Sequence, residues 1–291
     1  MASNLLKKHE VMLFDQNESV IQYLVSSNSS KAHKSHPDEM VKYCQSIVTM
    51  LPSSPNIREV YVDSTEALIH SLKISSNKPL LLDCSTIDPL TARELSLQMH
   101  QIGVSALDCP VSGGVGGASD ATLTFMVGSN DESDYENAKS ILLCMGKKVI
   151  HTGKSGTGQT AKICNNLALA IEMSAVSEAF NLGRKLGIDL KVLSDIFNSA
   201  SARCWSTEVY SPVTGLMPNV PSSNNYRGGF QSRLMQKDLH LALGAAKEIE
   251  MKLSFGELTS NLYQKLILDK GKGELDFSYI YQAMQEQNPN K

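Results

Sequence analysis

The chain has 291 residues, a length at which a single hydrophobic core stops growing, so two domains are expected. Hydrophobic residues make up 42% of the chain and charged residues 20%, which is ordinary for a globular protein. A net charge of −3 argues against a nucleic-acid or anionic-membrane partner, and no apolar run is long enough to cross a bilayer. These numbers favour a globular protein of two domains.

The 6 cysteines are scattered and form no CxxC pair, which indicates a reducing compartment rather than a disulfide framework or a zinc site. A close histidine pair, His33 and His36, lies in the polar stretch 26–37, with no thiol or carboxylate ligand set beside it. We expect this stretch to be a solvated loop, and we expect no metal site in the chain.

Up to about residue 154, short apolar runs alternate with amphipathic segments, the pattern of a parallel α/β sheet. Asp88, followed by proline, predicts the start of a helix over 89–101, and Asp131 predicts one over 132–144. The predicted strands are 11–14, 46–51, 80–83, 104–108, 123–127 and 148–151.

Beyond Gly158 the chain changes character. The segment 160–186 is apolar on most faces, which predicts a long buried helix. Three further helices are predicted over 189–199, 232–249 and 255–269, and the irregular stretch 212–229 is expected to form a long ordered loop or a lid. The predicted architecture is a doubly wound α/β domain in 1–154 and an all-helical domain in 155–291. A cleft at their junction is the expected ligand site.

The segment 110–114 reads Pro-Val-Ser-Gly-Gly and follows a predicted strand. The adjacent glycines, Gly113 and Gly114, let the backbone approach a ligand closely and present N–H groups to an anion. Ser112 adds a hydroxyl donor, and the glycines at 116–117 are expected to extend the bare backbone. This combination suits a small carboxylate. The alternative is a glycine-rich turn that binds nothing.

Lys162 and Asn166 are four residues apart and therefore share one face of the predicted helix. Burial among apolar neighbours disfavours the charged form of a lysine, which is what a general acid/base for an alcohol–carbonyl interconversion requires. Asn166 can hold the hydroxyl of such a substrate through its amide. The alternative is a lysine that extends to solvent.

Several weaker signals lie near the ends of predicted strands. In a dinucleotide-binding fold, an acid such as Asp15 binds the adenosine ribose and disfavours a 2′-phosphate, although it could instead cap the following helix. Lys237 could reach into the cleft or form an ordinary pair with Asp238. The carboxyl ends of parallel strands are where ligands bind, but turn chemistry explains the same residues equally well. The strand-end residues concerned are Leu51, Pro52, Asn56 and Thr86.

Seven segments together resemble the 3-hydroxyisobutyrate dehydrogenases, which are β-hydroxyacid dehydrogenases, and especially the mitochondrial type. The similarity as a whole runs from residue 1 to about 283. The segments are 83–89, 108–114, 123–128, 158–166, 203–205, 221–226 and 234–239. The resemblance implies a Rossmann-like NAD-binding domain and the oxidation of 3-hydroxyisobutyrate to methylmalonate semialdehyde in valine breakdown. It also implies a mitochondrial location and a homodimer or homotetramer built through the helical domain, although residues 1–4 lack transit-peptide character.

The same resemblance implies a role for each candidate residue. Lys162 is the general acid/base, Asn166 holds the substrate, and Asp15 faces the adenosine ribose. The substrate carboxylate is bound by Ser112, Gly113 and Gly114. The cofactor side is lined by Leu51, Pro52, Asn56, Thr86 and Lys237.

Residues 1–8 resemble the middle of the first helix of the family, so the first strand and its GxGxxG loop are expected to be missing. Two strands would then lack a ladder partner. Losing two or three phosphate hydrogen bonds corresponds to roughly 3–8 kcal/mol of cofactor binding, or about two to five decades of affinity. Weak NAD binding and little turnover are therefore expected.

Three interpretations stay open. The first is a dehydrogenase whose sequence begins at an internal methionine. The second is a catalytically impaired paralogue that acts as a binding or hetero-oligomer subunit. The third is a reductase of another short semialdehyde, because a carboxylate-binding turn alone does not distinguish such substrates.

Overall fold

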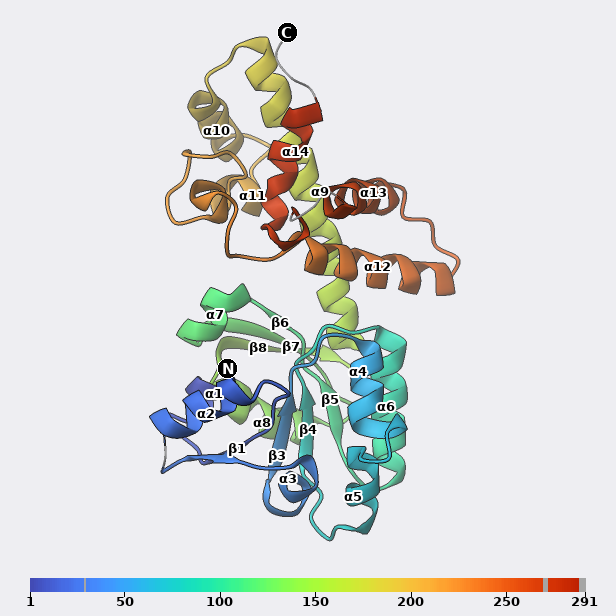
Figure 1. The fold of residues 1–291 in the computed structure, drawn as a ribbon. Helices are drawn as coiled ribbons and strands as arrows, with labels where there is room; N and C mark the ends of the chain where they lie inside the picture. Colours follow the sequence, from blue (N-terminus) through green and yellow to red (C-terminus); the bar gives the residue numbers. More distant parts are fainter. Residues whose placement is uncertain (29, 269–271, 288–291) are drawn as a thin grey trace. The chain divides into compact units, whose positions relative to one another are not determined.

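The computed structural model describes residues 1–28, 30–268 and 272–287 (Figure 1). The chain divides into two compact units, Met1–Lys162 and Ile163–Lys291. The division falls inside a helix, α9 (Thr157–Leu186), a little further along than the 154/155 boundary expected from the sequence. Within the described residues, no helix combines the length and the apolar composition that a membrane span requires.

The strands of the first unit form two sheets. In the smaller sheet, β1 (Val11–Leu13) and β2 (Ala32–Lys34) pair in parallel. The larger sheet has the order β3-β4-β5-β7-β6, with β8 beside β7. Its strands are β3 (Ser46–Thr49), β4 (Leu80–Asp83), β5 (Ala106–Asp108), β6 (Val111–Ser112), β7 (Leu123–Gly128) and β8 (Gly146–Gly153). Strands β3, β4 and β5 run parallel, as do β7 and β8, whereas β5 and β6 are antiparallel to β7.

The parallel sheet and all six predicted strands are confirmed, although the sheet is divided. No ladder joins β1 to β3 in the described residues, so each of these strands pairs on one side only. The expectation of a solvated loop over 26–37 was only partly correct. His33 and His36 are exposed as expected, but His33 lies in β2, which begins at the buried Ala32, and His36 is the N-cap of α3 (Pro37–Tyr43). A strand of three residues offers too little alternation to be recognised from sequence.

Helices cover both faces of the larger sheet. Helices α4, α5 and α6 lie on one side, and α8 packs on the other (Figure 1). The helices of this unit are α1 (Ala2–Leu5), α2 (Glu18–Ser27), α3 (Pro37–Tyr43), α4 (Ser54–Arg58), the π-helix η1 (Glu59–Asp63), α5 (Leu68–Ile74), α6 (Pro89–Gln101), α7 (Gly114–Asp120) and α8 (Glu132–Leu142).

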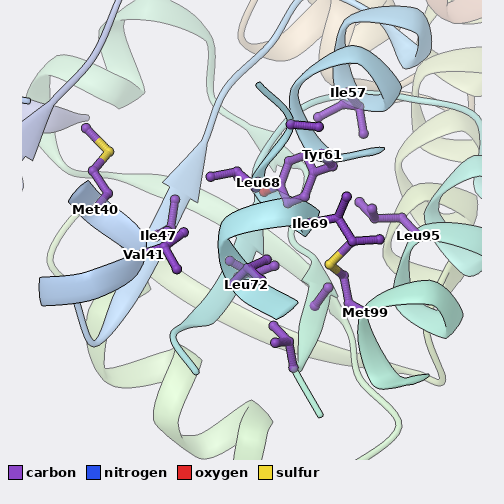
Figure 2. Packing of buried hydrophobic residues seen from close by; sticks show 14 of the residues in the cluster. Met40, Val41, Ile47, Ile57, Tyr61, Leu68, Ile69, Leu72, Leu95 and Met99 are labelled. Carbon is purple, nitrogen blue, oxygen red and sulfur yellow. The ribbon is translucent and has the colours of Figure 1, made fainter. Parts of the chain in front are cut away.

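The side chains of β4 alternate between two hydrophobic cores, as the period of a strand requires. Leu81 packs with α3, α4, α5 and α6, whereas Leu82 packs with β7 and α8. Figure 2 shows the first of these cores, to which Tyr61 of η1, Leu72 of α5 and Met99 of α6 contribute side chains. Burial on both faces explains why the predicted central strands read as continuous apolar runs.

The described part of the second unit is helical, as predicted, apart from an isolated bridge between Gln231 and Asp276. Its elements are α9, α10 (Leu190–Ser199), α11 (Trp205–Glu208), the 3-10 helix η2 (Pro221–Asn224), α12 (Ser232–Glu248), α13 (Ser254–Leu268), the 3-10 helices η3 (Lys272–Glu274) and η4 (Phe277–Tyr279), and α14 (Ile280–Gln287). The helix predicted over 255–269 ends at Leu268, and residue 269 lies outside the described residues.

The predicted helix starts are confirmed. Asp88, Asp131 and Asp189 each accept hydrogen bonds from two backbone N–H groups in the first turn of α6, α8 and α10 respectively. The stretch 212–229 is an ordered loop, because the Tyr226 hydroxyl donates to the carbonyl of Pro212 at 2.8 Å.

The prediction that α9 is buried on most faces was only partly correct. Ala170, Met173, Val176 and Phe180 are buried in two cores of the second unit. Along its C-terminal part, however, one face of α9 is open to solvent and carries exposed leucines. Composition alone therefore overestimated the burial of this helix.

Truncation of a buried leucine in the first unit should lower the free energy of unfolding as it does in other proteins. Leu72 is fully buried in α5, whereas Ile74, two residues later, is 88% exposed. We expect Leu72→Ala to lower the free energy of unfolding by about 2–5 kcal/mol. We expect Ile74→Ala to change it by less than about 0.5 kcal/mol. Urea unfolding followed by far-UV circular dichroism checks both, and equal effects would contradict the described packing.

Candidate active site

The predicted carboxylate-binding segment follows β5 and contains a turn that only glycine adopts easily. Ser112 pairs with Thr124 of β7, which holds the start of the turn against the sheet. Gly113 and Gly114 then have φ angles of +137° and +62°. A Cβ atom on Gly113 would lie 3.0 Å from the Leu123 side chain. The turn therefore requires both glycines, and their backbone is exposed directly after the Ser112 hydroxyl.

The expectation that the glycines at 116–117 extend the bare backbone was wrong. Both lie within α7, where the N–H of Gly117 donates to the carbonyl of Gly113 at 3.0 Å. A Cβ atom on Gly116 would meet no atom within 4 Å, so nothing in the described structure requires glycine there. The bare backbone is limited to Gly113 and Gly114.

Lys162 and Asn166 lie one turn apart on the same side of α9. Both side chains are buried, and Lys162 is only 8% exposed. This burial disfavours the alternative of a lysine that extends to solvent. Gln159, one turn earlier, donates from Nε2 to the carbonyl of Ser85 at 2.8 Å and accepts from the N–H of Ile87 at 3.1 Å. The start of α9 is thereby attached to the loop that follows β4.

Asp108 makes a second attachment to the start of α9. Its Oδ1 accepts from the N–H of Gly156 at 2.7 Å, and its Oδ2 accepts from the N–H of Gln159 at 2.9 Å. Burial raises the pKa of this carboxyl to about 6, because desolvation outweighs the two hydrogen bonds and the nearby carboxylate of Asp83 adds repulsion. Sequence reasoning assigned no role to Asp108, although an acid at the end of a buried strand was a signal.

The strand-end residues proposed for the cofactor side come together at one edge of the larger sheet. Thr49 and Asp83, which end β3 and β4, are in register, so Leu51 and Thr86 follow neighbouring strands. The Ser85 hydroxyl accepts from the N–H of Leu51 at 2.7 Å.

A buried carboxylate holds these strand ends. Oδ1 of Asp83 accepts from the hydroxyls of Thr49 at 2.9 Å and Ser85 at 2.6 Å. Beyond β3, Pro52 is exposed, and Asn56 lies in α4, where its Oδ1 accepts from the Ser53 hydroxyl at 2.7 Å.

Asp15 lies apart from this group, because it follows β1 in the smaller sheet. It is exposed, and its Oδ1 accepts from the N–H of Asn17 at 2.8 Å. The N-cap of α2 is Asn17 rather than Asp15, so Asp15 does not cap that helix directly. Its exposed carboxylate is available to a ligand.

In the second unit, a buried carboxylate joins two candidate residues. Asn166 donates from its amide to Oδ2 of Asp238, and Nζ of Lys237 lies 3.4 Å from Oδ1 of the same side chain. Asp238 is buried, and about a third of the Lys237 side chain is exposed. The sequence suggested only an ordinary pair between Lys237 and Asp238, and the contact with Asn166 was missed because 72 residues separate the partners.

These features define a class of protein. A Rossmann-like domain with polar groups at the carboxyl edge of its sheet is the architecture of dinucleotide-binding enzymes, and a buried lysine on the helix that follows suits proton transfer. Residues 1–153 match the model for the NAD-binding domain of 6-phosphogluconate dehydrogenase. Residues 156–284 match the model for the NAD-binding of NADP-dependent 3-hydroxyisobutyrate dehydrogenase.

Individual relatives specify the family. The chain is 46% identical to the probable mitochondrial 3-hydroxyisobutyrate dehydrogenase of Dictyostelium discoideum and 42% identical to the mitochondrial enzyme of Mus musculus. Each alignment covers 99% of this chain, and they cover 88% and 84% of those proteins. A solved structure of Mycobacterium tuberculosis 3-hydroxyisobutyrate dehydrogenase with L-serine gives a TM-score of 0.89 at 35% identity and covers 98% of this chain and 94% of that one. The chain belongs to the 3-hydroxyisobutyrate dehydrogenase family.

A side chain at the positive-φ turn should destabilise the first unit, whereas one in α7 should not. We expect Gly113→Ala to lower the free energy of unfolding by about 1–3 kcal/mol, because alanine is strained at a φ of +137°. Gly116→Ala is the matched control and should be neutral or stabilise by up to about 1 kcal/mol, because it lies in a helix with open space around it. Urea unfolding measures the free energy of unfolding of both variants. A larger decrease for Gly116→Ala than for Gly113→Ala would refute the described turn.

Proposed function

We propose that this chain oxidises 3-hydroxyisobutyrate to methylmalonate semialdehyde with NAD, a step of valine breakdown. The observation that carries the proposal is the buried Lys162 on α9, in a family whose named relatives are 3-hydroxyisobutyrate dehydrogenases. Those relatives are also named as mitochondrial, which supports the same location for this chain. The family alone does not distinguish this substrate from other short hydroxy acids, so the site must supply the argument.

In the proposed complex, the substrate carboxylate lies at the turn after β6. The Ser112 hydroxyl donates to it, and the exposed N–H groups of Gly113 and Gly114 add two backbone donors. The solved Mycobacterium relative is described with L-serine. That molecule has the same arrangement of a carboxylate and a terminal hydroxymethyl group on one carbon as 3-hydroxyisobutyrate, with an ammonium group in place of the methyl group.

Lys162 acts on the hydroxyl end of the substrate. The neutral amine of Lys162 takes the hydroxyl proton of the substrate at Nζ. At the same time a C–H bond breaks at the carbon that carries this hydroxyl, so the alcohol becomes an aldehyde. NAD, when bound, supplies the acceptor for the hydride. Asn166 holds the substrate oxygen through its amide, and Asp238 orients that amide from its other side. In the reverse direction the ammonium form of Lys162 returns the proton.

The residues present fit a nicotinamide dinucleotide. Leu51, Pro52, Asn56 and Thr86 lie at or beyond the carboxyl edge of β3 and β4, the edge where dinucleotides bind in such sheets. Lys237 is also proposed to contact the cofactor. The exposed carboxylate of Asp15 fits the ribose hydroxyls and repels a 2′-phosphate, which favours NAD over the NADP named in one family description.

Lys162 is the residue whose loss should stop the chemistry. We expect Lys162→Met to lower the single-turnover rate of NADH formation from 3-hydroxyisobutyrate by about 10²- to 10⁴-fold, because the proton acceptor is gone. NAD affinity, measured by calorimetry, should be unchanged. Lys154→Met removes an exposed lysine just before α9 and should retain the rate of the parent chain. If the parent chain forms no NADH at saturating NAD, or if Lys162→Met retains the rate, the proposed function is wrong.

We also propose that a second copy of the chain covers the exposed apolar residues of α9 and α10, giving a homodimer or homotetramer. Phe180 of α9 packs against Phe197 of α10 at a ring distance of 4.9 Å, so the inner faces of the two helices are already filled. The residues left outside are Leu182, Leu186, Val192 and Ile196, which are 46–77% exposed. Apolar residues gathered on neighbouring helices usually mark a protein contact.

A charged side chain among these exposed apolar residues of α9 and α10 should dissociate the oligomer. We expect Leu186→Asp to shift the sedimentation coefficient of the chain to that of a monomer at micromolar concentration, because burying an unpaired carboxylate is costly. Ile74→Asp introduces the same charge at an exposed apolar residue of the first unit and should leave the assembly intact. Analytical ultracentrifugation compares the two, and a parent chain that sediments as a monomer would refute the proposal.

A further inference from the structure

Asp108 occupies the position where the carboxylate-binding turn begins. It is the last residue of β5, and the chain continues from it through Pro110 to Ser112. The turn is held against β7, because the carbonyl of Pro110 accepts from the N–H of Met126 at 3.0 Å. Only three residues separate Asp108 from Ser112, so the position of Asp108 in β5 limits where the turn can lie.

The side chain of Asp108 reaches the other candidate element, the start of α9. Its two oxygens accept from the N–H groups of Gly156 and Gln159, and the second of these lies one turn before Lys162. The carboxylate thus satisfies two amides at the beginning of a helix, where a negative charge is also favoured by the helix dipole. All of these contacts lie within the first unit.

The surroundings of Asp108 are shaped to hold the carboxylate in one orientation. A Cβ atom on Gly158 would lie 2.8 Å from Oδ2, and one on Gly128 would come closer still to Oδ1. Both positions are glycine, which makes room for the carboxylate between β7 and α9. With only 4% of its surface exposed, Asp108 has no alternative position in solvent.

We propose that Asp108 is a positioning residue of the reaction, which ties the carboxylate-binding turn to the first turn of α9 and so sets where Lys162 stands against the bound hydroxy acid. The inference rests on the proposed function, because it takes the role of Lys162 from there. Asp108 itself touches neither substrate nor cofactor. It acts by fixing the distance between the group that anchors the acid end and the group that takes the proton.

Protonation of Asp108 should weaken this link. A carboxylic acid retains one good acceptor oxygen, and its O–H faces an N–H donor, so one of the two backbone bonds is lost. The pKa of about 6 places this change near neutral pH. The other ionisable groups around it are Asp83 of β4, Tyr61 of η1, Arg93 of α6 and Cys109. Burial raises the pKa of Tyr61 and of Cys109 further above their ordinary values, so both stay neutral.

The test compares Asp108→Asn with Asp131→Asn. Asp131 accepts from two N–H groups at the start of α8 and is exposed, so the matched change alters a helix start that touches no candidate site residue. For Asp108→Asn we expect kcat to fall roughly tenfold to a hundredfold, the scale of a small misplacement, with an unchanged KM for NAD. The inflection of kcat near pH 6 that the parent chain is expected to show should be absent from this variant. Asp131→Asn should keep the rate and the pH profile of the parent.

A second measurement does not depend on turnover. Acetic anhydride labelling, followed by mass spectrometry of the peptide that contains Lys162, should proceed several-fold faster in Asp108→Asn than in the parent chain and Asp131→Asn, because the first turn of α9 is released. An unchanged labelling rate, or an inflection of kcat near pH 6 that persists in Asp108→Asn and therefore belongs to Asp83 or another group, overturns the inference. If the parent chain makes no NADH, the proposed function fails, but a labelling change confined to Asp108→Asn still supports the positioning role.

Discussion

The first unit depends on a buried carboxylate that joins the end of a strand to the beginning of a helix. Burial removes water from the Asp108 carboxylate and raises its pKa. The carboxylate accepts hydrogen bonds from the backbone N–H groups of Gly156 and Gln159. Without an acceptor, each of these buried N–H groups would cost about 1–3 kcal/mol. The bond therefore determines where α9 begins, and the position of Lys162 follows from the helix geometry.

Buried carboxylates also hold other segments of the chain in place. Asp83 holds the ends of β3 and β4 through Thr49 and Ser85, and Asp238 holds the amide of Asn166. Asp276 accepts from the Tyr210 hydroxyl and from the N–H of Phe230, and so closes the long loop of the second unit. Asp83 and Asp276 are buried and accept several hydrogen bonds, and buried Asp238 accepts one hydrogen bond and forms an ion pair with Lys237, so each carboxylate orients its partners without a ligand. Buried acids thus orient Asn166 and the ends of β3 and β4.

Elements with strong local signals were predicted well, and those held by distant partners were not. The helices over 89–101 and 132–144 begin at Asp88 and Asp131 as predicted, because capping is a local interaction. Strand β2 and helix α7 were missed, since β2 is short and depends on pairing with β1, and α7 is rich in glycine, which disfavours helix in isolation. Packing against the sheet overrode that preference.

The sequence by itself determined the order of α/β and helical units, the two-glycine turn after Ser112 and the shared helix face of Lys162 and Asn166. All of these follow from local periodicity and backbone conformation. Tertiary structure decided which buried acids hold those groups, because the contacts of Asp108 with Gln159 and of Asp238 with Asn166 join residues 51 and 72 positions apart. No local pattern encodes such a pairing. It arises only when folding removes water from an acid and leaves a particular amide as its partner.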